Sequence, residues 1–146
     1  MNMNRCLLFF LCLCAASWSG CSRAAAIMDP DLRECSGIAA SRTQPGVLWA
    51  HNDSGNPPDL FAIGTDGRTL GRWRLSVPNL DWEDIAVDGS KIYIADTGNN
   101  NRQRTTVLVH RVREPKVGAA STALLDVDQT WWLTFPEMPF DCESLA

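Results

Sequence analysis

After about residue 30, the chain alternates short apolar runs with polar segments rich in Gly, Asn, Asp and Pro. The apolar runs are rich in Val, Ile, Leu, Trp and Tyr, which is typical of β-strands joined by turns. No segment after the N-terminal leader has the period of an amphipathic helix. The pattern therefore predicts an all-β fold with strands near 36–41, 47–52, 59–64, 69–76, 83–87, 91–96, 105–112 and 128–135.

Two motifs recur in the same order, which indicates an internal repeat. The first consists of an acid, a bulky residue or Cys, two polar or small residues, an aliphatic residue and Ala, and its copies start 47 and 60 residues apart. Such a period is found in blade-type repeats. The second motif, Asp-Ser/Thr-Gly-Asn, follows the first two copies. The copies are Glu34–Ala39, Asp81–Ala86 and Asp141–Ala146 for the first motif, and 53–56 and 96–99 for the second.

The second unit resembles a known repeat. Residues 85–100, which read Ile-Ala-Val-Asp-Gly-Ser-Lys-Ile-Tyr-Ile-Ala-Asp-Thr-Gly-Asn-Asn, are similar to an NHL repeat, and 37–63 is similar to a more divergent copy. The resemblance implies a β-propeller of four-stranded antiparallel blades, usually about six in number. Its relatives include secreted bacterial proteins of unknown activity, lyases, lactonases and phytase-like hydrolases, so it implies a fold more than an activity.

This resemblance predicts how the chain is divided. We expect an incomplete propeller over 27–146, with blade 1 at about 34–77, blade 2 at about 81–136 and the first strand of blade 3 from 141. About two blades and one strand do not close a ring, so the chain is expected to be the N-terminal fragment of a larger propeller.

The N-terminal leader has the features of an export signal. Arg5 precedes an apolar run of 11 residues at 6–16, which is shorter than the roughly 20 residues that span a bilayer. Either 1–26 is a signal peptide cleaved after small residues, or 1–20 is removed and Cys21, which follows a lipobox-like Trp-Ser-Gly, carries a lipid. Both alternatives predict an exported protein, either periplasmic or extracellular or lipid-anchored to the cell envelope. Cys21 would be its only attachment to a membrane.

Charge and missing motifs exclude several classes of function. The net charge is −4 and the Lys and Arg residues do not cluster, which argues against a nucleic-acid partner. The sequence lacks G-x-S-x-G, H-E-x-x-H, a Walker loop and G-x-G-x-x-G, which disfavours nucleophilic and nucleotide-dependent chemistry.

Acidic residues open each copy of the first motif. Residues i and i+2 of a strand point the same way, so Asp81 is expected to pair with Glu83 and Asp141 with Glu143, while Glu34 takes the equivalent place in blade 1. Where the crossovers enter the channel of a propeller, these carboxylates are candidates for holding Ca²⁺. The favoured alternative is structural, because carboxylates at strand starts accept backbone N–H bonds.

A second set of polar residues belongs to the loops expected on the same face. Asp and Asn cap turns and Gly supplies a positive φ, so a role in turn formation is favoured over ligand binding. Arg102 could meet an anionic ligand, and Trp82, beside the acids, is the aromatic candidate for ligand contact. The loop-face candidates are His51, Asp53, Asn56, Asp96, Asn99 and Arg102.

Two functions fit these features. The favoured one is an exported binding or scaffold module whose polar, acidic face meets a small-molecule, glycan or protein ligand. The alternative is a Ca²⁺-dependent hydrolase, lactonase-like or phytase-like, that is inactive as this fragment. The first is favoured because a fold resemblance transfers poorly to activity.

Cys35 and Cys142 are expected not to form a disulfide with each other. They occupy equivalent repeat positions two blades apart, whereas a disulfide needs Cα atoms within about 7 Å. Peptide mapping of the monomer by mass spectrometry without reduction should find no linkage between them. A Cys35–Cys142 crosslinked peptide would contradict the blade register.

Overall fold

The computed structural model of the chain describes residues 25–118 and 124–145, and this part is all-β with nine strands and no helix. Residues 1–24 of the leader, including Cys21, lie outside the described residues. The eight strands predicted between 36 and 135 are confirmed, with ends that differ by at most one residue from those expected. They are β1 (Cys35–Ala40), β2 (Val47–Asn52), β3 (Asp59–Gly64), β4 (Thr69–Leu75), β5 (Trp82–Asp88), β6 (Lys91–Asp96), β7 (Thr106–Arg113), β8 (Leu124–Leu125) and β9 (Val127–Thr134).

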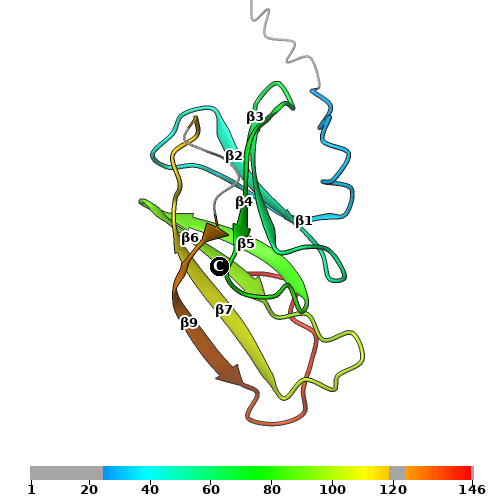
Figure 1. Cartoon of the computed structure of the whole chain (residues 1–146). Coiled ribbons are helices and arrows are strands. Elements are labelled where there is room, and N and C mark those ends of the chain that lie inside the picture. Colours follow the sequence, from blue (N-terminus) through cyan, green and yellow to red (C-terminus); the bar gives the residue numbers. More distant parts are fainter. Residues whose placement is uncertain (1–24, 119–123, 146) are drawn as a thin grey trace, which may run out of the picture.

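The strands form two sheets (Figure 1). The first sheet has the order β1-β2-β3-β4-β8 and the second has the order β5-β6-β7-β9. All neighbours are antiparallel except β8, which pairs parallel to β4 through two residues and was not expected from the sequence. The hairpin between β3 and β4 turns at Asp66-Gly67 as predicted, with Gly67 at a φ of 82°. Apart from β8, which comes from the second repeat, each sheet is thus built from one sequence repeat.

The two sheets pack face to face through large apolar side chains. The first sheet contributes Trp49 and Trp73, whose rings lie 5.6 Å apart, and the second contributes Ile85 and Ile92. All four side chains are at most 4 % exposed. Burial of each stabilises the fold by about 1.5–3 kcal/mol, so this layer is the main core.

Packing brings β1 directly beside β5, and Gly37 allows the close approach. A Cβ at this position would lie 2.5 Å from Nε2 of His51 and 3.0 Å from the backbone nitrogen of Ile85. Trp82 is fully buried in the same layer, with its ring 5.5 Å from that of His51. The expectation that Trp82 meets a ligand is therefore wrong, because neighbouring side chains cover the indole.

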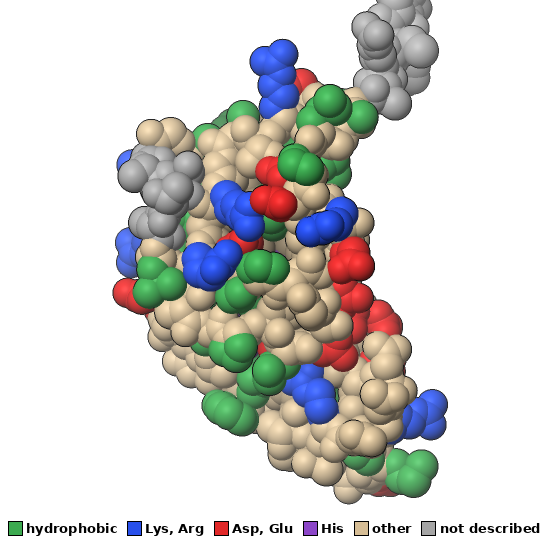
Figure 2. All heavy atoms as spheres, turned by 45° about the vertical axis from the view of Figure 1, so that its right-hand side comes forward, with side chains coloured by type: hydrophobic (Ala, Val, Ile, Leu, Met, Phe, Trp, Pro, Cys, Tyr) green, Lys and Arg blue, Asp and Glu red, His purple; other side chains and the backbone are tan. Residues whose placement is uncertain are grey.

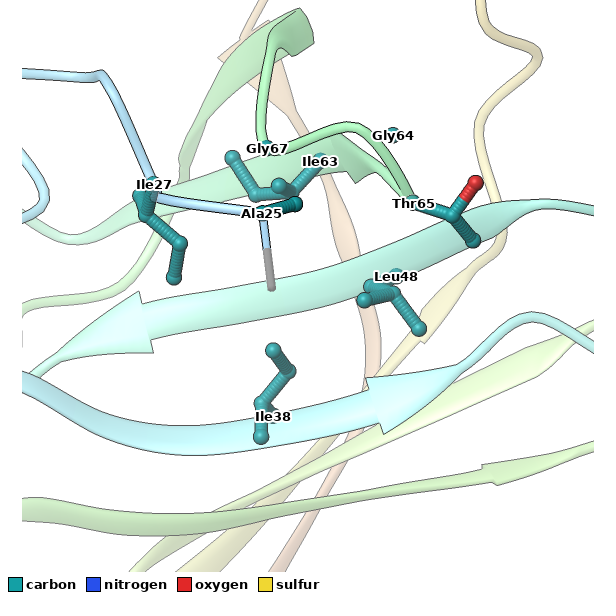
Figure 3. Close-up of a pocket in the computed structure, with 8 residues that line it drawn as sticks. All are labelled: Ala25, Ile27, Ile38, Leu48, Ile63, Gly64, Thr65 and Gly67. Carbon is teal, nitrogen blue, oxygen red and sulfur yellow. The ribbon is translucent and has the colours of Figure 1, made fainter. Parts of the chain in front are cut away.

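The opposite face of the first sheet is partly covered, because Leu32 of the N-terminal segment packs with Ala50, Phe61 and Ile63. It holds an apolar pocket of about 330 Å³ lined by Ile38, Leu48 and Ile63, with Ile27 of the N-terminal segment at its edge (Figure 3). Ile38 is 49 % exposed, whereas its repeat counterpart Ile85 is 4 % exposed because the first sheet covers it. The same repeat position is buried only where a neighbouring sheet packs on it.

An aromatic pair shows the same asymmetry on the outer face of the second sheet. Tyr93 and Trp131 occupy the strand positions that Trp49 and Trp73 occupy in the first sheet, and their rings stack 6.0 Å apart. Trp73 is 3 % exposed beneath the second sheet, whereas Trp131 is 37 % exposed. The two sheets therefore repeat in packing as well as in sequence.

The third copy of the motif forms no strand within the described residues. It nevertheless lies beside β5, because the backbone nitrogen of Leu145 donates to Oδ2 of Asp84 at 2.8 Å. Thr97 Oγ1 also donates to the carbonyl of Cys142 at 2.6 Å. The strand expected from about 142 has no described partner strand to pair with. Its segment nevertheless lies beside β5, as β5 lies beside β1. Cys35 and Cys142 are both free.

Asp59 is expected to make stability depend on acidic pH. Its carboxylate is 1 % exposed and accepts hydrogen bonds from Arg72 and Arg74, with Arg74 Nε at 2.6 Å. Burial alone would raise the pKa of Asp59, but the hydrogen bonds and charges of the two arginines outweigh it and hold the pKa below its usual value. The stabilisation is then present above the unfolded-state pKa of about 3.9 and is lost as the pH falls through the folded-state pKa.

Replacing Asp59 with Asn should therefore lower the free energy of unfolding at pH 7 by about 1–3 kcal/mol, because charge-assisted hydrogen bonds are lost from partly exposed arginines. Denaturant unfolding from pH 7 to pH 2 should show the two proteins converge at the acid end. Asp126→Asn, at an exposed carboxylate, is the matched control. Parallel curves for wild type and Asp59→Asn over the whole range would contradict the role given to Asp59.

Candidate functional site

The same irregularity opens both inner strands. The pairing register shifts between Cys35 and Gly37 in β1 and between Trp82 and Asp84 in β5, so one residue bulges from each strand. A bulge re-aims the side chain of the extra residue. The bulged residues are Ser36 and Glu83, and Ser36 Oγ donates to the Glu83 carbonyl at 3.2 Å and to its Oε2 at 3.4 Å.

Glu83 lies at the centre of two groups of carboxylates. Its side chain joins Asp53 and Asp81 in one group and Asp141 and Glu143 in the other, with the oxygens of each group within 4.8 Å of one another. Figure 2 shows acidic side chains gathered along one flank of the molecule. The expected pairs Asp81/Glu83 and Asp141/Glu143 are thus brought together, and they meet at a shared residue.

The loop after β6 holds these acids in place through its backbone. The nitrogen of Gly98 donates to the carbonyl of Asp81 at 3.1 Å, and that of Asn99 donates to Oδ1 of Asp141 at 2.6 Å. A Cβ at position 98 would collide with the carboxylates of Asp81 and Glu83. Glycine is therefore required here for close approach and not for a positive φ, which in this motif only Gly55 adopts, at 76°.

Asp96 anchors the start of the acidic segment. It is fully buried, and its carboxylate accepts the backbone N–H groups of Leu80 and Asp81 and an ion pair from Arg104 at 2.8 Å. Burial would raise the pKa of Asp96, but hydrogen bonds from His110 and Arg104 and the arginine charge hold it below its usual value. Asp96 is thus a satisfied structural acid, as the turn-forming interpretation predicts.

Asp53 is not the structural counterpart of Asp96, so the alignment of the two Asp-Ser/Thr-Gly-Asn motifs is wrong by one residue. Asn52 pairs with Cys35 as Asp96 pairs with Trp82. Asn52 Oδ1 accepts the backbone N–H of Glu34 at 3.1 Å, just as Asp96 accepts that of Asp81. Asp53 is therefore free of the anchoring role, and its carboxylate belongs to the group around Glu83.

Proximity of so many carboxylates changes the ionisation of Glu83. Its side chain is 7 % exposed. Burial, then the hydrogen bond and charge of Glu143, then the charges of Asp53 and Asp81 raise the pKa of Glu83 to about 8. No arginine, lysine or histidine among the described residues forms an ion pair with it.

The remaining acid and histidine candidates lie outside the two groups. Glu34 is exposed and accepts a hydrogen bond from Asn56 Nδ2 at 2.6 Å. His51 is fully buried with Nδ1 3.0 Å from the carbonyl of Asn52, and burial lowers its pKa. These contacts give Glu34 and Asn56 a role in the turn, and they give His51 a role in the core.

The loop candidates divide between structure and surface. Asn99 is 3 % exposed and closes the loop on itself, because its side chain donates to the carbonyl and accepts the N–H of Arg104. Arg102 is exposed, and it is the only described non-glycine residue with a positive φ, at 52°. Asn99 contacts the carboxylates only through its backbone nitrogen, which donates to Asp141, and its side chain is used within the loop.

Sequence reasoning missed Ser36 and the place of Asp53 among the acids. A signal for Ser36 was present, since it holds the position in the first motif that Glu83 and Glu143 hold in the later copies. The position of Asp53 depends on the length of a turn, which the motif itself does not reveal.

No protein-family model matches this chain, and no curated protein matches it. The NHL resemblance therefore stays a prediction from the quoted residues. Within residues 25–118 and 124–145, no helix capable of crossing a bilayer is present.

The raised pKa of Glu83 predicts that stability changes with pH between about 4.5 and 8. The folded-state pKa of about 8 lies above the unfolded-state value. At pH values between the two, Glu83 is therefore protonated in the folded protein and ionised in the unfolded protein. Stability should therefore fall as the pH rises from about 4.5 to 8. Glu83→Gln should remove this fall, and so should gain stability relative to wild type as the pH rises.

Denaturant unfolding in EDTA at several pH values across this range measures the effect. Glu137→Gln, at an exposed glutamate, is the control and should follow wild type. If Glu83→Gln also followed wild type, Glu83 would be ionised throughout and the electrostatic account above would fail.

Proposed function

We propose that this protein is an exported binding module of the β-propeller type whose acidic face holds a divalent cation, preferentially Ca²⁺, at Glu83. The observation that carries the proposal is the convergence of four carboxylates, from chain segments far apart in sequence, on the buried Glu83. The export step rests on the sequence of the leader.

Repetition of the sheet packing supports the propeller. Each sheet has four antiparallel strands from one repeat, and the second sheet packs on the aromatic face of the first. The three copies of the first motif fall in β1, in β5 and in the segment at 141–145, and each copy contacts the next. This is the arrangement expected of inner strands that line a central channel.

Ligand chemistry favours a hard cation. Both groups contain only carboxylates. The Ser36 hydroxyl and the Glu83 carbonyl, which are hydrogen-bonded to each other, are two further oxygens beside them. Oxygen-only sites suit Ca²⁺, Mg²⁺ or Mn²⁺, whereas zinc and copper prefer sites with imidazole or thiolate. Ca²⁺ accepts six to eight oxygens in a flexible geometry, which suits a cluster made of separate loops.

A cation also resolves the electrostatic conflict at Glu83. Without one, like charges and burial favour the protonated side chain. A bound divalent ion would favour the carboxylate and lower its pKa, so the proton and the cation compete for the same oxygens. The acidic face could then present an electropositive centre to a ligand with oxygen donors.

The alternative function is a Ca²⁺-dependent hydrolase, lactonase-like or phytase-like. The observation that favours it is the pKa of Glu83, since a carboxyl with a pKa of about 8 can act as a general acid near neutral pH. Hydrolysis of lactone or phosphate-ester substrates that is lost in Glu83→Gln would support the enzyme. Tight ligand binding without turnover would support the binding module.

Ca²⁺ should raise the melting temperature of the protein relative to EDTA. A ligand at about 100 times its dissociation constant stabilises the folded state by about 2.7 kcal/mol. Glu83→Gln should abolish the gain because Glu83 belongs to both carboxylate groups. Asp81→Asn and Asp141→Asn, tested separately, should show which group holds the ion. The gain in wild type should also grow as the pH rises through 8, because the proton then competes less.

Glu34→Gln and Asp126→Asn are the controls, since neither carboxylate belongs to the two groups. Both variants should leave the difference between Ca²⁺ and EDTA unchanged. If Ca²⁺ and EDTA give the same melting temperature for wild type at pH 8.5, the acids are structural and the cation site does not exist.

A further inference from the structure

A second cavity lies beside the acids and has a different chemistry. It has a volume of about 290 Å³ and is enclosed mainly by the loop that follows β6, with Ser54 and Leu80 on the other side. Asp81 lines this cavity and also belongs to the carboxylate group with Glu83. The volume is close to the lower end of the roughly 300–1,000 Å³ found for small-molecule pockets.

The floor of the cavity is fixed by internal hydrogen bonds. Arg104 donates to the carbonyl of Gly98 at 2.8 Å and to that of Asp96 at 2.9 Å, in addition to its ion pair with the Asp96 carboxylate. Asn99 bonds to both backbone groups of Arg104. The loop therefore keeps its shape without a ligand, and the guanidinium has its partners within the protein.

Side chains at the rim are free to bind a ligand. Asn100, Asn101 and Gln103 line the cavity and are exposed, and none of their amides makes a hydrogen bond to another described residue. Each amide offers donors and an acceptor. Together with the Ser54 hydroxyl and the Asp81 carboxylate, they form a set suited to hydroxyl groups, which both donate and accept.

Charge argues against an anionic ligand. The only cation lining the cavity is Arg104, which is paired with Asp96, and the neighbouring acids would repel a negative charge. Leu80, 53 % exposed, adds an apolar surface suited to the C–H face of a sugar ring. We propose that this cavity binds a neutral, hydroxyl-rich ligand, in chemical class a mono- or disaccharide.

This inference rests on the proposed binding function and names the class of its ligand. It does not depend on the bound cation. Asp81 would contact the sugar directly, and a cation at Glu83 would lie within reach of the same carboxylate. The two binding events are nevertheless measured separately, the sugar by amide shifts and the cation by the melting temperature.

Titration of ¹⁵N-labelled protein with glucose, galactose, mannose and N-acetylglucosamine tests the proposal, with galacturonate as the anionic counterpart. At least one neutral sugar should shift the backbone and side-chain amides of residues 99–104, and galacturonate should bind more weakly. The double replacement Asn101→Ala and Gln103→Ala should weaken binding by at least about tenfold. Arg102→Ala, in the same loop but outside the cavity, should bind as wild type does.

Several results would overturn the proposal. They are stronger binding of galacturonate, equal binding by the double variant and wild type, and no shift of residues 99–104 by any neutral sugar. Each titration is run in Ca²⁺ and in EDTA. If Ca²⁺ raises the melting temperature but no sugar binds, the ligand class fails and the cation site stands. If sugar binds in EDTA while Ca²⁺ has no effect on melting, the cavity stands and the cation site fails.

Discussion

Packing of the two sheets through Trp49 and Trp73 is the constraint on which the rest of the structure depends. These indoles fill the layer against Ile85 and Ile92, and that contact sets the spacing between β1 and β5. Only at this spacing does the bulge at Ser36 meet the bulge at Glu83. Loss of a large aromatic side chain from such a layer typically costs about 3–5 kcal/mol, so the polar site cannot be separated energetically from the apolar core. The position of the acids is thus a consequence of sheet packing as much as of their own hydrogen bonds.

The sequence predicted the strands well because a two-residue period and Gly, Asn and Asp turns leave few alternatives. It also predicted that the acids at 81, 83, 141 and 143 would gather, but it included Glu34, which lies apart, and missed the place of Asp53. It failed where the outcome depends on strand register and on contacts between repeats. Pairing with β1 and β5 makes Asn52, and not Asp53, equivalent to Asp96. Trp82 is polar-flanked in sequence, yet the neighbouring sheet buries it, and no local pattern reports that contact.

Gly98 shows how one residue can be identified correctly as special for the wrong reason. A Gly between Thr and Asn suggests a turn with positive φ, and Gly55 in the first copy has that conformation. At position 98 the backbone lies against Asp81 and Glu83 instead, and the missing Cβ is what allows the acids to come close. Alignment of the strands also makes Asn52 equivalent to Asp96, so Gly55 and Gly98 are offset by one position and are not structural counterparts.

Comparison of the buried acids gives the strongest argument that Glu83 has a function beyond stability. The described residues contain four buried carboxylates, at Asp59, Glu83, Asp96 and Glu114. Burial would raise the pKa of Asp59, Asp96 and Glu114, but donors such as Arg72, Arg104 and Trp49 outweigh it and hold each pKa below its usual value. Glu83 is the exception, because its neighbours are other carboxylates and its pKa rises to about 8. Several donors surround each of the other three buried acids, whereas the donor to the Glu83 carboxylate is the Ser36 hydroxyl, at 3.4 Å. A glutamate whose pKa is raised in this way destabilises the folded protein at neutral pH. Cation binding or proton transfer at Glu83 would explain why the protein has such a residue.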